Sequence, residues 1–232
     1  MSEFTAFPSK MLVCLVGRHK GEKLVEVTKA AGARGGTITL GHSLGNNKLL
    51  QALSLGDVQH DMVLTILGAE RGAVIKAIRE AAERDPKKLG GIAMVLNVPQ
   101  LFLRTGTPNL PETNQNQDRS EIMESGYTLI TAIVNTGYGD DVMTAARSAG
   151  ASGGTILAAR GTGTEDDVKF FGITLVPEKE MLMIIAEKEK VAPIVKAIGS
   201  VPKLSEPGGG IVFTQNVEEF ILLGQHKDWA AS

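Results

Sequence analysis

Two clusters of glycine recur at places where backbone N–H groups can receive an anion. The first precedes a threonine and occurs as Gly35-Gly36-Thr37 and again as Gly153-Gly154-Thr155. The second occurs as Gly90-Gly91 and again as Gly208-Gly209-Gly210. Glycine lets backbone N–H groups approach an anion closely, and threonine adds a hydroxyl donor beside them. An ordinary turn glycine is the alternative for any single cluster, so the repetition of both favours a binding site.

Side chains that could catalyse a reaction or bind a metal are sparse. The four histidines have no metal-ligand spacing to one another or to the single cysteine, Cys14, and no Gly-x-Ser-x-Gly element presents a nucleophile. Glu165, Asp166 and Asp167 form an acidic cluster, for which a solvated loop is favoured over a Mg²⁺ site. We therefore expect a binding protein that is not an enzyme, with no metal site and no required cofactor.

The glycine clusters belong to an internal duplication. A shift of 118 residues lays "AGARGGTITLGH" (31–42) on "AGASGGTILAAR" (149–160), and a shift of 119 lays "HDMVLTIL" (60–67) on "KEMLMIIA" (179–186). The agreement keeps its order over about ninety residues, as expected of a repeat. It predicts one domain at 1–104 (copy 1), a linker at 105–126, a second domain at 127–223 (copy 2) and a polar tail at 224–232.

Each copy has the pattern strand, helix, strand, strand, helix, strand. This order predicts an α+β fold of two tandem ferredoxin-like (βαββαβ) domains, each an antiparallel sheet with both helices on one face. The strands are continuous apolar runs such as "KMLVCLVG" (10–17), so the face opposite the helices must also be covered. We expect association of sheets between copies or chains to cover it.

The bulk composition excludes several classes of protein. The chain has 232 residues and a net charge of −2, so no overall basic field attracts nucleic acid. No window approaches eighteen apolar residues, so we expect no membrane-embedded helix. The lone cysteine and the absence of a secretory pattern in "MSEFTAFPSK" favour the cytoplasm.

The segments around the glycine clusters resemble the P-II nitrogen regulatory family. The similarity lies in "AGARGGTITLGHS" and "AGASGGTILAARGTG", and in "GGIAMVLNVPQLFLRTGT" (90–107), which resembles the closing segment of the family. The resemblance implies a divergent P-II-like signal-transduction protein. It implies three-fold rings of domains whose clefts bind an adenine nucleotide as effector, and flexible loops that regulate an enzyme or membrane transporter in nitrogen metabolism.

The resemblance also implies roles for individual residues. Thr37 and Thr155 would hold the adenine end, the Gly90-Gly91 and Gly208–Gly210 turns the phosphates, and Arg104 an outer phosphate. His42 and Arg160, which align with each other, complete the predicted ligand-binding set.

The chain departs from the family where charge matters. The family's lysine after the phosphate-loop glycine is here Gly91 or Gly210, and the first arginine of its Arg-x-Arg pair is Phe102. Each missing charge removes a charge-assisted hydrogen bond of about 1.5–3 kcal/mol.

Assembly follows from the duplication. If a ring needs three domains and each chain supplies two, three chains complete two rings, which predicts a homotrimer. Two other functions remain open. One is an enzyme of the ferredoxin-like α+β-barrel type with His42 or Tyr138 as acid or base, and the other is a protein resembling the trimeric divalent-cation-tolerance family.

Overall fold

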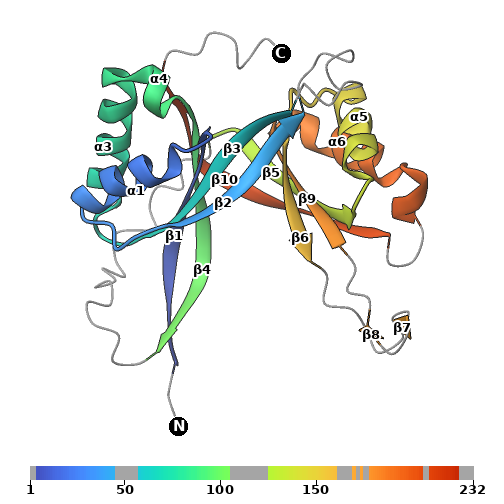
Figure 1. Cartoon of the computed structure of the whole chain (residues 1–232), viewed down its shortest axis with the longest axis horizontal. Helices are drawn as coiled ribbons and strands as arrows, with labels where there is room; N and C mark the ends of the chain where they lie inside the picture. The colour runs from blue at the N-terminus through green and yellow to red at the C-terminus, as the bar shows by residue number, and fades with distance from the viewer. Residues whose placement is uncertain are drawn as a thin grey trace. The chain divides into compact units, whose positions relative to one another are not determined.

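The structure is a computed structural model of the chain (Figure 1) and describes residues 4–44, 57–104, 125–160, 169–170, 173–174, 178–205 and 209–224. The predicted linker lies outside the described residues except for Ser125 and Gly126, and the predicted tail except for Gly224. The acidic cluster Glu165–Asp167 and Gly208 also lie outside them.

The elements of copy 1 follow the predicted order, with one short helix added. They are β1 (Phe4–Gly17), α1 (Gly21–Ala30), β2 (Thr37–Leu44), β3 (Asp57–Leu67), α3 (Arg71–Arg84), α4 (Pro86–Leu89) and β4 (Gly91–Arg104). Strand β1 pairs antiparallel with β3 on one side, Val13 opposite Leu64, and with β4 on the other, Val13 opposite Met94.

Copy 2 repeats this order and adds a hairpin of two very short strands. Its elements are β5 (Tyr127–Asn135), α5 (Gly139–Ser148), β6 (Thr155–Arg160), β7 (Lys169–Phe170), β8 (Ile173–Thr174), β9 (Glu178–Glu187), α6 (Lys188–Gly199), a 3₁₀ turn (Pro202–Ser205) and β10 (Gly210–Leu223).

The main strands form one hydrogen-bonded series. Paired neighbours run in the order β1-β3-β2-β6-β9-β5-β10-β4. This differs from the separate antiparallel sheets predicted for the two copies. The physical reason is that β2 and β10 extend beyond their own copies: the end of β2 pairs with β6, and the end of β10 pairs with β4. Pairing in this way satisfies edge N–H and C=O groups that would otherwise be open. The three-fold rings concern several chains and stay a prediction.

The chain divides into two compact units, and the ends of β2 and β10 belong to the unit of the other copy. Unit 1 comprises Met1–Thr39, His60–Tyr127 and Asn216–Trp229, and unit 2 comprises Leu40–Gln59, Thr128–Gln215 and Ala230–Ser232. Copy 2 therefore supplies the last part of β10 to unit 1, while copy 1 supplies the end of β2 to unit 2.

The core of unit 1 lies between its strands and the helices α1 and α3, which cover one face (Figure 1). Alternate β1 residues Leu12, Cys14 and Val16 point into this core, as the period of a strand requires. Val13 and Leu15, on the opposite face of β1, are also buried. Burial of both faces is what the continuous apolar runs predicted.

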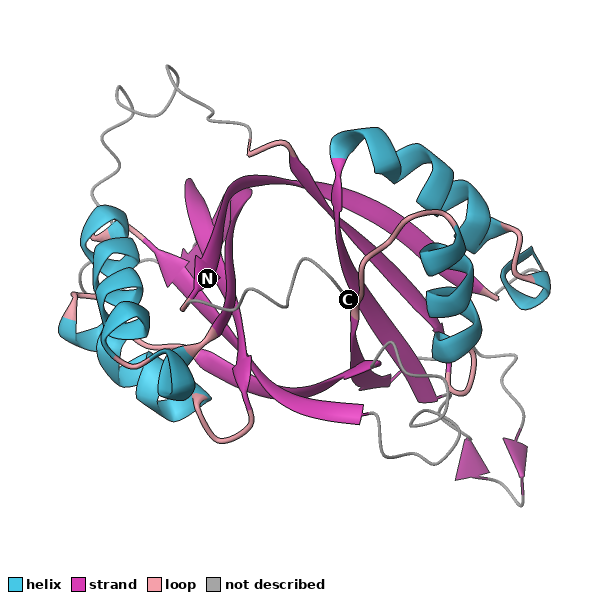
Figure 2. Ribbon diagram, turned by 90° about the horizontal axis from the view of Figure 1, so that it is seen from above, coloured by secondary structure: helices cyan, strands magenta, loops and turns pink. Residues whose placement is uncertain are grey.

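The core of unit 2 has the same construction. Helices α5 and α6 lie against one face of the strands of unit 2 (Figure 2). Ile130, Ala132 and Val134 of β5 alternate into a cluster completed by helix residues such as Met143 and Ile194. Both cores contain aliphatic side chains and methionine or cysteine, in agreement with the 4% aromatic content.

Candidate functional site

The repeated glycine phrase begins with a helix ending. Gly32 and Gly150 follow helices α1 and α5 with φ of 106° and 101°, in the left-handed region. Their N–H groups donate to Lys29 and Arg147 carbonyls at 3.0 Å. Glycine is favoured here because it adopts positive φ without a Cβ penalty and satisfies the last helical carbonyls. The first glycine of the phrase is thus structural in both copies.

The glycine immediately before the threonine is required by packing. A Cβ on Gly36 would lie 3.0 Å from Thr65 Oγ1 and 3.1 Å from Val25 Cγ2. A Cβ on Gly154 would lie 2.9 Å from Met143 Sδ and 3.0 Å from Ile184 Cγ1. In each copy the first helix and the third strand pack so closely here that a side chain would displace its neighbours.

Gly35 and Gly153 are different, because neither packing nor backbone conformation demands glycine there. A Cβ on either would have no neighbour among the described residues within 4 Å. Neither has a positive φ. The open space beside both is compatible with the approach of a ligand to the backbone.

The glycines that open the fourth strand lie close to the first strand. A Cβ on Gly91 would come 2.0 Å from the Leu15 carbonyl oxygen, and one on Gly210 would come 2.8 Å from that of Ile133. Gly90 ends α4 in an extended conformation, and Gly209 is half-buried before β10. Close approach of neighbouring strands therefore explains Gly91 and Gly210.

Within unit 1 the two clusters are not brought together. Gly36 precedes β2 and Gly91 opens β4, and these strands occupy opposite ends of the order β4-β1-β3-β2. Three strand spacings of about 4.8 Å place them about 14 Å apart across the sheet. A single ligand-binding turn cannot be made from both clusters of one copy.

The predicted polar ligands differ between the copies. Thr37 is exposed, whereas Thr155 is 3% exposed and lies opposite Ser43 of β2. His42 is half-buried and lies opposite Ile156, while Arg160 is exposed at the end of β6. Arg104 ends β4 opposite Phe4, and its side chain lies outside the described part of the chain. The two threonines therefore cannot present their hydroxyls equally.

Sequence reasoning missed a carboxylate at the N-terminus of the first helix in each copy. The N–H of Gly21 donates to Asp61 Oδ2 at 2.9 Å, and the N–H of Gly139 donates to Glu180 Oε2 at 2.8 Å. A helix N-terminus attracts negative charge. The signal was available, because Asp61 aligns with Glu180 at a shift of 119 and Gly21 with Gly139 at a shift of 118.

Asp61 is further held by a cation. The Arg18 guanidinium donates to Asp61 Oδ1 at 2.9 Å, and the Asp61 side chain is 5% exposed. Burial raises the pKa of Asp61, but the Gly21 N–H and the Arg18 side chain outweigh it, so that this pKa lies below its usual value. The N-terminus of α1 is therefore already paired with a carboxylate of the same chain, Asp61.

The turn before the first helix has the same left-handed backbone conformation in both copies, although the residue type differs. His19 has a φ of 63°, and Gly137 at the equivalent position has a φ of 93°. A left-handed histidine is uncommon. It places an imidazole between Arg18 and Lys20 where copy 2 has no side chain.

Comparison with known proteins finds a family match over copy 2. Residues 127–227 match the family model described as nitrogen regulatory protein P-II. The second copy of the repeat is thus similar in sequence to the P-II family. A solved structure of a PII-like signalling protein from Thermus thermophilus is 19% identical, covers 41% of this chain and 89% of that chain, and has a TM-score of 0.31. No curated protein matches the chain.

The P-II-like match covers β5 to β10, which confirms the resemblance stated from the sequence. The structure explains one departure from the family pattern. A lysine at Gly91 or Gly210 would bring its Cβ within 2.8 Å or less of a carbonyl oxygen of the first strand. The backbone approach that both copies adopt is therefore incompatible with the family's lysine.

The described part of the chain contains neither a membrane-spanning helix nor a metal-binding cluster. No helix among residues 4–44, 57–104, 125–160, 178–205 and 209–224 is long and apolar enough to cross a membrane. The same residues contain no group of three or more His, Cys, Asp or Glu side chains that would hold a metal ion.

Proposed function

We propose that this P-II-like protein is a regulator that binds a small anionic effector, an adenine nucleotide, and controls a protein partner. The observation that carries the proposal is the match of residues 127–227 to the P-II family. The repeated strand-opening glycines of both copies support it. A role in nitrogen metabolism, a location in the cytoplasm and the domain limits 1–104 and 127–223 are parts of the proposal.

Gly35 and Thr37 form the best-supported part of the binding site. Gly35 has open space on its Cβ side and Thr37 is exposed. Backbone N–H groups and a hydroxyl can then both reach a ligand. The burial of Thr155 argues that copy 2 binds the effector differently or more weakly. The remaining predicted ligands, His42, Gly90, Arg104 and Arg160 among them, belong to the proposal in the roles given above.

The charge pattern predicts that the site distinguishes only weakly between nucleotides with one, two or three phosphates. The positions where the family carries lysine are occupied by Gly91 and Gly210, and no cation can be placed there without moving the backbone. Each charge-assisted phosphate contact contributes about 1.5–3 kcal/mol. We therefore expect ATP to bind no more than about tenfold more tightly than AMP, since a tenfold ratio corresponds to about 1.4 kcal/mol.

Titration calorimetry with ATP, ADP and AMP tests the effector. Gly35→Val is the matched perturbation, because a Cβ at Gly35 has no neighbour within 4 Å among the described residues, and a branched side chain there would block a ligand. Gly153→Val makes the same change at the equivalent position and measures the share of copy 2 in binding. We expect Gly35→Val to weaken nucleotide binding at least tenfold without lowering the melting temperature. Absence of heat with every nucleotide would refute the effector.

A second candidate function has one specific observation in its favour. The order strand, helix, strand, strand, helix, strand found in each copy also occurs in ferredoxin-like α+β-barrel enzymes. Thermal shift with nucleotides, Cu²⁺ and Zn²⁺ separates the alternatives, because a ligand stabilises the state that binds it. Nucleotide stabilisation favours the regulator and metal stabilisation the cation-tolerance function. Light scattering tests the proposed homotrimer, which requires about three times the 24.6 kDa mass of the chain.

A further inference from the structure

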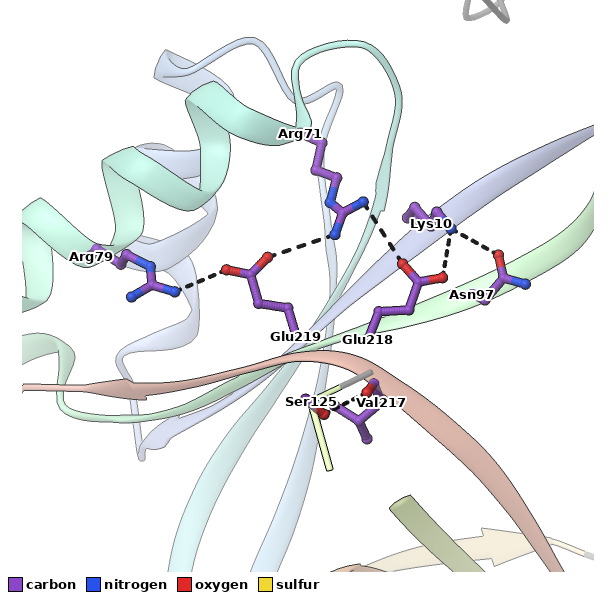
Figure 3. Close-up of polar contacts among 8 residues, drawn as sticks. All are labelled: Lys10, Arg71, Arg79, Asn97, Ser125, Val217, Glu218 and Glu219. Atoms are coloured by element: carbon purple, nitrogen blue, oxygen red, sulfur yellow. Dashed lines mark hydrogen bonds and ion pairs between the residues drawn. The ribbon is translucent and has the colours of Figure 1, made fainter. Parts of the chain in front are cut away.

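The end of β10 carries two adjacent carboxylates that meet cations of unit 1 (Figure 3). The ammonium of Lys10 donates to Glu218 Oε1 at 2.6 Å and to Asn97 Oδ1 at 3.1 Å. Glu218 is only 8% exposed and the Lys10 side chain 14%. A charge this far from water is retained only when it is paired. The pairing partner of Glu218 is therefore built into β1.

Helix α3 supplies the rest of the network. Arg79 donates to Glu219 Oε1 at 2.9 Å. Arg71 lies between the two carboxylates, 3.7 Å from Glu218 Oε2 and 3.7 Å from Glu219 Oε2 (Figure 3). Three cations from two elements thus surround two consecutive glutamates.

Backbone pairing and apolar burial hold the same segment, which we call the strap (Val217–Leu223). Its residues pair antiparallel with Gly91–Leu96 of β4, from Val217 opposite Leu96 to Leu223 opposite Gly91. Val217, Ile221 and Leu223 are buried. Phe220 stacks on Tyr127 with ring centroids 4.7 Å apart. The strap thus occupies the β4 edge as an added strand does in peptide recognition, with main-chain bonds for affinity and side chains for specificity.

The charged receptor is peculiar to unit 1. The shift of 118 places Thr128 at the position of Lys10. The match of "VIKAI" (74–78) with "IVKAI" (194–198) places Val191 at the position of Arg71 and Gly199 at that of Arg79. Copy 2 therefore has no equivalent set of cations, although it supplies the strap by sequence.

A break in the strand coincides with the point where the strap begins. The register shifts between Val217 and Glu219, and the boundary between the two units falls between Gln215 and Asn216. A bulge bends its strand and interrupts the ladder. It is therefore a suitable hinge for moving Glu218–Leu223, the part of the strap that follows Val217.

We propose that the β4 edge, with Lys10, Arg71 and Arg79, is a docking site for the strap of a second copy of this chain. The second copy fits because it carries the same two carboxylates and the same buried side chains in the same register, so every contact of the strap forms again between chains. Exchange of an identical element is a low-cost route to association. This interaction goes beyond the proposed regulatory function and does not depend on it.

Disulfide trapping between full-length chains tests the proposal. Ala93 lies opposite Ile221, so a chain carrying Ala93→Cys is mixed with a chain carrying Ile221→Cys and oxidised. Cys14 stays in place, because complete burial raises its pKa to about 12 and keeps the thiol unreactive. We expect a covalent dimer that increases with protein concentration. Both substitutions in one chain provide the control for geometry, and they should give an intrachain bridge.

Two further chains sharpen the test. Ala93→Cys mixed with Leu222→Cys reports random collision, because Leu222 is 53% exposed and is out of register with Ala93. We expect at least tenfold less dimer from this pair. Glu218→Gln with Glu219→Gln should increase trapping when placed in the Ala93→Cys chain, whose own strap is then a weaker competitor. The same double change should decrease trapping when placed in the Ile221→Cys chain.

The outcomes are decisive. A dimer no more abundant than that of the collision control, although the intrachain bridge forms, overturns the exchange. An equal effect of the glutamine pair in both chains overturns the role of the ionic network. Failure of the intrachain bridge overturns the pairing from which the proposal starts.

Discussion

Replacing Gly36 or Gly35 with alanine separates packing from ligand binding within one phrase of the sequence. A methyl group at Gly36 would lie 3.0 Å from Thr65 Oγ1, 3.1 Å from Val25 Cγ2 and 3.3 Å from the Leu64 carbonyl oxygen. Overpacking of this kind costs about 1–3 kcal/mol. Loss of backbone freedom in the unfolded chain returns about 0.4–1 kcal/mol. We therefore expect Gly36→Ala to lower the free energy of unfolding by about 1–2 kcal/mol.

Gly35→Ala should behave in the opposite way. Its Cβ meets nothing within 4 Å among the described residues and its φ is not left-handed. Only the unfolded-state effect remains, so the variant should be stabilised by about 0.4–1 kcal/mol. For a chain of this size, 1 kcal/mol shifts the melting temperature by about 2–4 °C. Differential scanning calorimetry resolves the pair.

The equivalent pair in copy 2 is an internal replicate. Gly154→Ala meets the Met143 sulfur at 2.9 Å and Ile184 Cγ1 at 3.0 Å. The flexible methionine can move aside, so the loss should be smaller than at Gly36. Equal stability of Gly35→Ala and Gly36→Ala, or greater damage from the former, would refute the assignment of these glycines.

Three further results are expected. Thr65→Val should raise the free energy of unfolding by about 1–2 kcal/mol in urea titration, because Thr65 Oγ1 is buried and has no hydrogen-bond partner among the residues that the structure describes. A lower free energy of unfolding would mean that the hydroxyl is hydrogen-bonded. His19→Gly should stabilise the protein by about 0.5–1 kcal/mol. A left-handed non-glycine residue costs about 1–2 kcal/mol, and the larger conformational entropy that glycine loses on folding offsets part of this gain. Gly137→Ala should destabilise the protein for the same reason. The stability that Asp61 adds depends on pH, because the pKa of Asp61 is lower in the folded state than in the unfolded state. This contribution is complete at pH values above the unfolded pKa, and it is lost as the pH falls toward the folded pKa. Asp61→Asn should therefore flatten the acid side of the stability profile, and an unchanged profile would contradict the pairing with Arg18.

Much of the local structure could be predicted from the sequence because it is determined by nearby residues. Apolar spacing predicts the strands and helices of both copies, and continuous apolar runs such as 10–17 predict burial of both strand faces. The partners of strand ends could not be predicted in this way. Nothing local distinguishes the part of β10 that pairs with β4 from the part before Asn216. That choice depends on Lys10 and Arg71, which lie far away in sequence and whose role as cations for Glu218 is visible only after folding.

The candidate site was predicted less well, for a related reason. A glycine in a sequence indicates that a side chain is absent, but not whether a neighbour or a ligand takes the space. Gly36 and Gly91 both resembled ligand turns, and the structure fills their Cβ positions with Thr65 and the Leu15 carbonyl. The helix-capping carboxylate Asp61 was missed because it lies forty residues from the helix that it caps.

The duplication itself separates the two explanations of a repeated residue. Two copies under the same packing constraints retain the same glycine for structural reasons, so repetition alone is not evidence of binding. Gly35 and Gly153 are repeated although their Cβ positions are open and their backbones need no glycine. Packing gives no reason for these two positions to agree, and the proposed effector site offers a shared ligand-facing role as the reason. Gly35→Val is therefore the substitution on which the proposed effector site depends, and its effect on nucleotide binding should appear without any loss of stability.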